Sequence, residues 1–282
     1  MPSPERGFAS PADLAACREA IRTGSRTFFA ASLLLPEKVR QPALALYAFC
    51  RQADDAIDLV GRREDALDLL RERLDRIYGA RPAPQPVDRA LADVVQRFPL
   101  PRALLDALLE GFEWDAAGRR YEDLPAVRAY AARVAGTVGA MMAVLMGIRA
   151  PAVVARACDL GVAMQLSNIA RDVGEDARAG RIYLPLQWLR EEGIDPDTWL
   201  AAPSFSAGLA RIVERLLRAA DLLYARADIG ITRLPLGCRP GIRAARLLYA
   251  GIGHEVERRG CDSVSQRAVV PLGRKARLLT QV

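Results

Sequence analysis

The sequence predicts an all-α protein, and three observations support this prediction. Ala, Leu and Arg, which are good helix formers, dominate the 282 residues. Alternating β-branched runs joined by hairpin dipeptides are nearly absent. Apolar residues recur at helical spacing from end to end, and Pro and Gly interrupt this pattern at intervals typical of loops.

The periodicity predicts a series of helices separated by short breaks. We expect them at about residues 11–22, 37–59, 63–78, 87–97, 101–117, 125–147, 151–179, 206–230 and 240–259. In chain order, Pro or Gly interrupts the pattern in ARPAPQP (80–86), FPLP (98–101), GIRAP (147–151), GRIYLP (180–185), EEGIDPDTW (191–199) and RLPLGCRPG (233–241). Because no break is long and no repeat is evident, residues 1–282 are predicted to form a single domain, with loose termini at about 1–10 and 271–282.

The formal charge is +6, and nearly all basic residues are Arg, since Lys38 and Lys275 are the only lysines. This balance suits an anionic partner, whether nucleic acid, acidic lipid or a phosphorylated small molecule, and does not choose among them. The five cysteines form no CxxC pair, which favours reduced thiols. No signal-peptide pattern is evident, and the most apolar run (134–148) is too short to span a bilayer comfortably, so a soluble protein is expected.

Three carboxylates lie close together in RQADDAIDLV (51–60), inside a segment otherwise suited to burial. On a helix, Asp54 and Asp58 are one turn apart, on the same face as Tyr47 and Arg51 and away from an apolar packing face. Two carboxylates at that spacing can share a hard cation such as Mg²⁺, which commonly binds one or two carboxylates together with substrate phosphates. A lone DxxxD pair is more often a solvated acidic face, so this pattern alone leaves both interpretations open.

A second polar face occurs in GVAMQLSNIARDVGEDARAGRIYLP (161–185). Asn168, Asp172 and Asp176 recur at i, i+4 and i+8, and Gln165 extends the row beside another apolar face. The side chains of Asn168, Asp172 and Asp176 supply the hard oxygen ligands that Mg²⁺ prefers. If the two faces oppose each other across a cavity, they repel strongly unless cations lie between them. The pair of motifs therefore predicts a shared metal site.

Long blocks around both faces resemble the squalene and phytoene synthase family, the head-to-head trans-isoprenyl diphosphate synthases. The matching blocks are GSRTFFAASLLLPEKVRQPALALYAFCRQADDAID (24–58), YAARVAGTVGAMMAVLMG (130–147), MQLSNIARDVGEDARAGRIYLP (164–185) and the later LLYARADIGITRLPLGCRPGIRAARLLYAGI. The resemblance covers nearly the whole chain. It implies an isoprenoid synthase fold, in which antiparallel helices form a bundle around a deep apolar cavity with metal-binding motifs at its mouth.

The resemblance also implies a reaction. Two geranylgeranyl diphosphates would condense head to head through prephytoene diphosphate to 15-cis-phytoene, with release of two diphosphates, as the first committed step of carotenoid biosynthesis. The implied cofactor is Mg²⁺, with Mn²⁺ as an alternative, and no NADPH is expected because the reaction ends in deprotonation. A cytoplasmic protein held peripherally on the inner face of the cell membrane is expected, because substrate and product are greasy. The resemblance also allows contacts with other carotenoid-pathway enzymes. It implies no binding of nucleic acid.

Residue by residue, the resemblance implies two metal sites and a set of substrate contacts. Asp54 and Asp58 would bind the metal on one diphosphate, and Asn168, Asp172 and Asp176 would bind it on the other. The four aspartates are catalytic candidates, as are Tyr130 and Tyr249, although each tyrosine is equally well explained as a core residue with a satisfied hydroxyl. The implied substrate-binding residues are Ser25, Arg26, Thr27, Tyr47, Arg51, Gln165, Arg171 and Arg267.

Two other functions stay open at this point. The same fold could make squalene or dehydrosqualene from farnesyl diphosphate, because the side chains that set the cavity depth cannot be identified from one sequence. A basic helical protein that binds RNA or acidic lipid would instead show ordered basic faces with aromatics. In this chain the acidic residues are ordered and the arginines are dispersed, which favours the enzyme.

Overall fold

The computed structural model describes residues 7–59 and 63–282, and these residues form helices without a strand among them. The first half contains α1 (Pro11–Gly24), α2 (Arg26–Ser32), α3 (Glu37–Leu59), α4 (Arg63–Tyr78), α5 (Pro86–Arg97), α6 (Arg102–Ala116), α7 (Leu124–Ala131), the π-helical turn η1 (Ala132–Gly136) and α8 (Thr137–Leu145). The second half contains α9 (Pro151–Arg178), α10 (Leu186–Glu191), α11 (Pro196–Ala201), α12 (Ala207–Ile231), the 3₁₀ turn η2 (Leu236–Cys238), α13 (Arg239–Arg258) and α14 (Leu272–Leu279). The prediction of an all-α protein is confirmed.

The long predicted helices agree with the structure, and one predicted helix is divided. The segment 125–147 consists of α7, η1 and α8, because the chain makes a π-helical turn at Ala132–Gly136. Such a turn inserts extra backbone into a helix without changing its apolar composition, so periodicity alone does not reveal it. The segment 271–282, for which a loose end was expected, contains α14.

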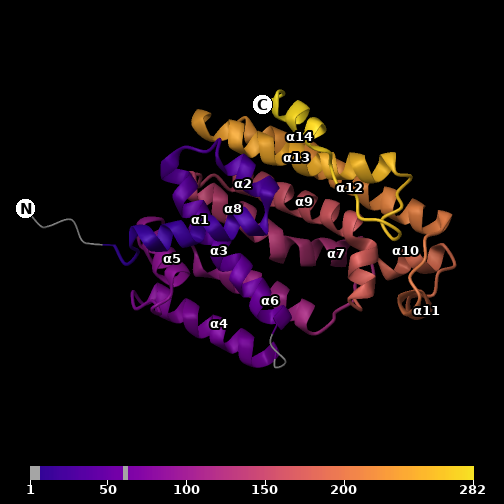
Figure 1. The fold of residues 1–282 in the computed structure, drawn as a ribbon, viewed down its shortest axis with the longest axis horizontal. Coiled ribbons are helices and arrows are strands. Elements are labelled where there is room, and N and C mark those ends of the chain that lie inside the picture. Colours follow the sequence, from indigo (N-terminus) through magenta and orange to yellow (C-terminus); the bar gives the residue numbers. More distant parts are fainter. Residues whose placement is uncertain (1–6, 60–62) are drawn as a thin grey trace, which may run out of the picture.

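The helices pack around two groups of buried apolar side chains. One group belongs mainly to α1, α3, α4, α5, α6 and α8, and the other mainly to α7, α9, α12 and α13. In Figure 1 the N-terminal helices occupy one side of the molecule, α12, α13 and α14 occupy the opposite side, and α8 and α9 lie between them. The two polar motifs therefore belong to different layers, with α3 among the N-terminal helices and α9 between the two sides.

Glycines bring α9 into backbone contact with the segment η1–α8. A Cβ atom added to Gly161 would lie 2.2 Å from the carbonyl oxygen of Ala135, and one added to Gly139 would lie 2.1 Å from that of Ala157. Both distances are far below van der Waals contact, so only glycine fits at either position. This close packing fixes the polar face of α9 relative to α8.

None of the helices in the described parts of the chain has an apolar stretch long enough to cross a membrane.

Candidate active site

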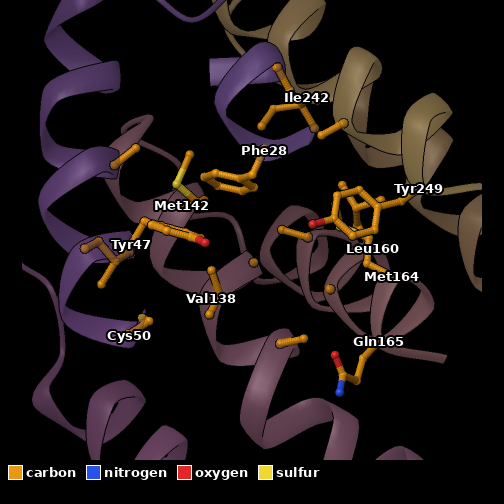
Figure 2. A pocket seen from close by; sticks show the side chains of 18 of the residues that line it. Phe28, Tyr47, Cys50, Val138, Met142, Leu160, Met164, Gln165, Ile242 and Tyr249 are labelled. Atoms are coloured by element: carbon orange, nitrogen blue, oxygen red, sulfur yellow. The ribbon is translucent and has the colours of Figure 1, made fainter. Parts of the chain in front are cut away.

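A cavity of about 370 Å³ lies between α2, α3, α8, α9, α12 and α13 (Figure 2). Its polar or aromatic lining residues include Tyr47, Arg51, Asp54, Asp115, Tyr130, Gln165, Asn168 and Tyr249. Its apolar lining residues include Leu35, Met142, Met146, Val153, Leu160, Ile231, Leu234 and Ile242. On both α3 and α9, mainly apolar residues line the cavity near the start of the helix and polar residues line it further along. The exception near the start of α9 is Arg156, which forms a salt bridge with Asp159 at 3.1 Å. The cavity thus has a polar end and an apolar end.

The predicted face of α3 lines the polar end. Tyr47, Arg51 and Asp54 all contribute to the lining, as the helical spacing predicts. Arg51 forms salt bridges with two aspartates of α3. Its Nη2 atom lies 2.6 Å from Asp55, and its Nη1 atom lies 3.7 Å from Asp54. Two of the predicted site side chains, those of Arg26 and Asp58, lie outside the described residues.

Tyrosine hydroxyls approach the centre of the cavity from two sides. In Figure 2, the hydroxyl of Tyr47 on α3 and that of Tyr249 on α13 point toward the open centre. Burial raises the pKa of Tyr47 to about 12, so its hydroxyl remains a hydrogen-bond donor at neutral pH. Burial also raises the pKa of Tyr249, and the neighbouring hydroxyl of Ser25 and charge of Arg171 oppose this rise in part.

The predicted face of α9 is divided between the cavity and its rim. Gln165 and Asn168 line the cavity, whereas Asp172 and Asp176 lie one and two turns further along the helix and are not among its lining residues. The amide nitrogen of Asn168 donates to Gln165 Oε1 at 3.4 Å. The Oδ1 atom of Asn168 is buried and has no hydrogen-bond partner among the described residues. A buried acceptor in this state calls for an explanation, and an ordered water or a cation beside it is one.

Two arginines hold Asp172 in its charged form. Arg171 donates to Asp172 from Nε at 2.7 Å and from Nη2 at 2.5 Å, and Arg267 donates from Nε at 2.8 Å. Burial would raise the pKa of Asp172, but these hydrogen bonds and charges outweigh it, and the pKa lies below its ordinary value. The structure therefore places Asp172, which the family resemblance implies as a metal ligand, in direct contact with Arg171 and Arg267, which it implies as diphosphate contacts.

Asp176 has the opposite electrostatic environment. Burial, followed by the charge of Asp172, raises the pKa of Asp176 to about 7. Arg181 opposes this rise in part, and Asp115 and Glu175 make smaller contributions to it. A carboxylate with excess negative charge around it is a favourable place for a cation.

The donor set suits a dication that is also bound by a ligand. Asp54, Asn168, Asp172 and Asp176 offer hard oxygen atoms, and the Oδ1 atom of Asn168 lacks a partner in the described structure. Among the residues that the structure describes, no group of three or more His, Cys, Asp or Glu side chains is arranged to hold a metal ion by itself. Mg²⁺ usually binds through one or two carboxylates plus substrate phosphates, so this arrangement fits a metal that arrives with a diphosphate.

An aspartate that sequence reasoning missed lies beside Tyr130. The Tyr130 hydroxyl donates to Asp115 Oδ2 and the Tyr183 hydroxyl donates to Asp115 Oδ1, both at 2.7 Å. Asp115 also lines the cavity. Burial first, and then the charge of Asp115, raises the pKa of Tyr130 well above its ordinary value. A signal was present, because Asp115 lies in the last turn of α6, within EGFEWDA, and Tyr183 belongs to the quoted GRIYLP motif.

The remaining predicted substrate contacts lie next to the cavity rather than in its lining. Ser25 is the N-cap of α2, and its side chain accepts a hydrogen bond from the backbone N–H of Phe28 at 3.2 Å. Thr27 is half-buried in the first turn of α2. Ser25 places the start of α2 beside Tyr249, at the side of the polar end.

The segment 259–271 between α13 and α14 brings Arg267 to Asp172. The backbone N–H of Gly174 donates to the carbonyl of Ser263 at 2.9 Å, and Arg178 donates to the carbonyl of Val264 at 2.6 Å. A Cβ atom on Gly174 would lie 2.4 Å from the Val264 oxygen. The segment therefore crosses α9 in contact with its backbone, between the two aspartates of the second motif.

Comparison with protein families gives a match over residues 21–274 to the squalene/phytoene synthase model. The chain belongs to the squalene/phytoene synthase family. A phytoene synthase from Cereibacter sphaeroides is 59% identical over 267 residues, covering 91% of this chain and 75% of that protein. A phytoene synthase from Rhodobacter capsulatus is 58% identical, covering 94% of this chain and 79% of that protein.

Solved structures of the squalene/phytoene synthase family share the fold. The crystal structure of a dehydrosqualene synthase in complex with ligand superposes with a TM-score of 0.87 at 32% identity, covering 96% of this chain and 95% of that chain. Squalene synthase HpnC from Alicyclobacillus acidocaldarius gives a TM-score of 0.81 at 26% identity, covering 88% and 94%. The expected isoprenoid synthase fold is confirmed.

Proposed function

We propose that the protein is a phytoene synthase, which condenses two geranylgeranyl diphosphates head to head to phytoene and releases two diphosphates. One observation carries this proposal: polar faces of α3 and α9 line one end of a cavity whose other end is mainly apolar. An isoprenyl diphosphate has this same division between a charged head and a hydrocarbon tail. The names of the relatives at 59% and 58% identity support phytoene as the product.

The reaction needs charge stabilisation at the polar end and exclusion of water from the rest. Mg²⁺, or Mn²⁺, would be held by Asp54 and Asp58 and by Asn168, Asp172 and Asp176, and would neutralise charge on the departing diphosphate. Arg51, Arg171 and Arg267 add fixed donors for diphosphate oxygens. The apolar walls keep water away from the carbocations, so that proton loss rather than hydration ends each step.

The two halves of the reaction use the same residues in succession. After one substrate ionises, the double bond of the other captures its C1 cation, and loss of a proton gives the cyclopropyl intermediate prephytoene diphosphate. A second ionisation, rearrangement and loss of a proton give phytoene, and no reductant is consumed. Tyr47, Tyr130, Gln165 and Tyr249 line the region where these steps would occur and are proposed to orient the substrates.

A second candidate, dehydrosqualene or squalene synthesis from farnesyl diphosphate, is favoured by the match to a dehydrosqualene synthase structure at 32% identity. Incubation of the purified protein with Mg²⁺ and either geranylgeranyl or farnesyl diphosphate, followed by identification of the hydrocarbon, separates the two. We expect phytoene from the C20 substrate without NADPH. Dehydrosqualene from the C15 substrate as the preferred product, or squalene formed only with NADPH, would contradict the proposal.

The place of action is proposed to be the cytoplasmic face of the cell membrane, because the product is a hydrocarbon with little solubility in water. Enzymes that supply geranylgeranyl diphosphate and desaturate phytoene are proposed as neighbours there. Flotation of a lysate tests this location. Protein that stays entirely in the soluble fraction at low salt would contradict it.

A further inference from the structure

Exposed apolar side chains lie directly outside the apolar end of the cavity. At the end of α2, Ser32 and Leu35 line the cavity. Leu33 and Leu34, which lie between them in the sequence, are 54% and 44% exposed. The cavity and the outer surface are therefore separated here by one short turn of chain.

The end of α12 repeats this arrangement. Gly230, Ile231 and Leu234 line the cavity. Ile229 is 64% exposed and Leu236 is 76% exposed. A second short stretch of chain thus has cavity-lining residues on its inner side and large apolar residues on its outer side.

The two stretches lie next to each other. A Cβ atom on Gly237 would lie 3.2 Å from Cγ of Pro36, and one on Gly241 would lie 2.6 Å from Cδ2 of Leu35. We call residues 31–36 and 229–237 together the apolar wall. Its exposed side chains are Leu33, Leu34, Ile229 and Leu236. In Figure 1 the same region lies where α2 meets the start of α13.

Unpaired positive charge surrounds the apolar wall. Lys38, Arg40, Arg233 and Arg239 come from the two stretches or the residues just after them, and no carboxylate in the described structure forms a salt bridge with any of the four. Arg40 and Arg239 donate instead to the backbone carbonyls of Leu33 and Leu234, which leaves their charges without a carboxylate partner. Glu37 is the only acidic residue in the sequence ranges 31–40 and 229–241. Elsewhere many surface arginines are paired, for example Arg211 with Glu192 and Arg215 with Glu191.

We propose that the apolar wall docks on a bilayer that contains anionic lipid, and that the hydrocarbon product leaves the cavity through it into the bilayer. Exposed leucines on turns can insert among acyl chains, while the surrounding Lys and Arg side chains bind anionic headgroups. A protein partner would satisfy the apolar side chains equally well, but the unpaired cations around them complement a surface of dispersed negative charge. The exit through the wall rests on the proposed function, whereas the docking does not.

The docking is tested by sedimentation of the purified full-length protein with vesicles of phosphatidylcholine, with and without phosphatidylglycerol. We expect binding to the anionic vesicles that weakens as salt is added. The triple variant Leu33→Ser, Leu34→Ser, Leu236→Ser is expected to bind at least about tenfold more weakly, since it loses three inserted side chains. The double variant Lys38→Glu, Arg233→Glu is expected to lose about tenfold on anionic vesicles only.

Matched controls separate this surface from general stickiness. Leu69→Ser with Phe205→Ser removes apolar residues that are 58% and 41% exposed on other parts of the molecule. Arg18→Glu reverses a charge on the exposed side of α1. These variants should bind vesicles like the wild type. Equal weakening by the controls, unchanged binding of the wall variants, or self-association through the leucines in place of vesicle binding would overturn the docking.

The exit is tested by rates of hydrocarbon formation in detergent micelles and with anionic vesicles. The triple wall variant should match the wild type in detergent, because none of its three residues lines the cavity, and should lose the acceleration that vesicles give. Acceleration that persists after vesicle binding is lost would overturn the exit. If the wild type makes no hydrocarbon in detergent, the proposed function fails, and the sedimentation result still decides the docking.

Discussion

Asn168 shows how a single amide distinguishes a binding site from a packing contact. Its side chain lies at the cavity with Oδ1 buried and unpartnered in the described structure, an arrangement that costs about 1–3 kcal/mol unless a ligand supplies the missing interaction. Such an atom in the same row as Asp172 and Asp176 is explained if a cation or its water binds there.

The first prediction concerns Asp172. Replacement Asp172→Asn removes a charged oxygen ligand that hydrogen bonds from two arginines hold in place, so the rate of hydrocarbon formation should fall by at least about 10²-fold. Thermal unfolding should show a retained fold. As a control, Asp68→Asn changes a side chain that is 78% exposed on α4 and should leave the rate unchanged. Wild-type turnover by the Asp172→Asn protein would show that the second motif is not part of the active site.

The second prediction concerns Asp115. In the variant Asp115→Asn the charged acceptor shared by Tyr130 and Tyr183 is lost, which should lower kcat and also reduce the free energy of unfolding by about 1–3 kcal/mol. Tyr183→Phe keeps the hydrogen bond between Tyr130 and Asp115 and should retain more activity. Rate assays on both variants check this order. If Tyr183→Phe is the more damaging change, Asp115 does not act by orienting Tyr130.

At the scale of single residues, the sequence predicts which side chains share a helix face better than it predicts which side chains contact each other in the fold. Helical spacing is enough to place Tyr47, Arg51 and Asp54 on one side of α3, because a helix fixes that geometry locally. The pairing of Asp172 with Arg267 joins positions 95 residues apart, and the contact of Asp115 with Tyr183 joins positions 68 apart. Such contacts depend on tertiary packing, which one sequence does not reveal.

Between elements, the segment 259–271 links the C-terminal region to α9. Gly174→Ala would place a Cβ atom 2.4 Å from the Val264 carbonyl, so the segment must move and Arg267 should lose its position against Asp172. We predict a raised KM for the diphosphate substrate in steady-state assays. Gly273→Ala is the control, because a Cβ atom there would meet nothing within 4 Å. Equal KM values for Gly174→Ala and wild type would show that the segment does not set the position of Arg267.

Helix α1 is tied to α5 through Asp13. Its carboxylate accepts hydrogen bonds from Arg89 at 2.5 and 3.0 Å and completes a capping box with Ser10. The hydrogen bond from Arg89, followed by that from the Ser10 backbone, holds the pKa of Asp13 well below its ordinary value. Since the folded-state pKa is depressed, this carboxylate stabilises the fold above its unfolded pKa of about 3.9, and the contribution is lost as pH falls toward the lower folded-state value.

Asp13→Asn should therefore lower Tm at pH 7, and the difference from wild type should shrink as pH falls below about 4. Thermal unfolding followed by circular dichroism across this range measures the effect. A difference in Tm that stays constant down to the lowest pH would show that packing, and not the charge of Asp13, joins α1 to α5.

Element prediction succeeded where helices are long and apolar on one side. The expected helices at 151–179, 206–230 and 240–259 correspond closely to α9, α12 and α13. The short helices α2, α10, α11 and α14 were not predicted, because six to eight residues contain too few turns to establish a period. The division of 125–147 depends on backbone hydrogen bonding at Ala132–Gly136 and not on composition.

At the scale of the whole molecule, family and fold could be predicted and the shape of the cavity could not. Motifs on α3 and α9 were enough to predict a shared site, and the structure places Asp54 and Asn168 in the lining of one cavity. The apolar wall could not be predicted, since its inner and outer residues come from two stretches that meet only after folding. Leu33 and Leu236 read simply as apolar residues in the sequence.

The central claim is that the polar faces of α3 and α9 together bind the diphosphate groups through shared dications. A crystal structure of the protein with Mg²⁺ and an unreactive thiolodiphosphate analogue of geranylgeranyl diphosphate tests it most directly. We predict metal ions bridging diphosphate oxygens to Asp54 on one side and to Asn168, Asp172 or Asp176 on the other, with the hydrocarbon tails among Met142, Leu160 and Ile242. Diphosphate bound away from both faces, or metal ions that contact neither, would contradict the account.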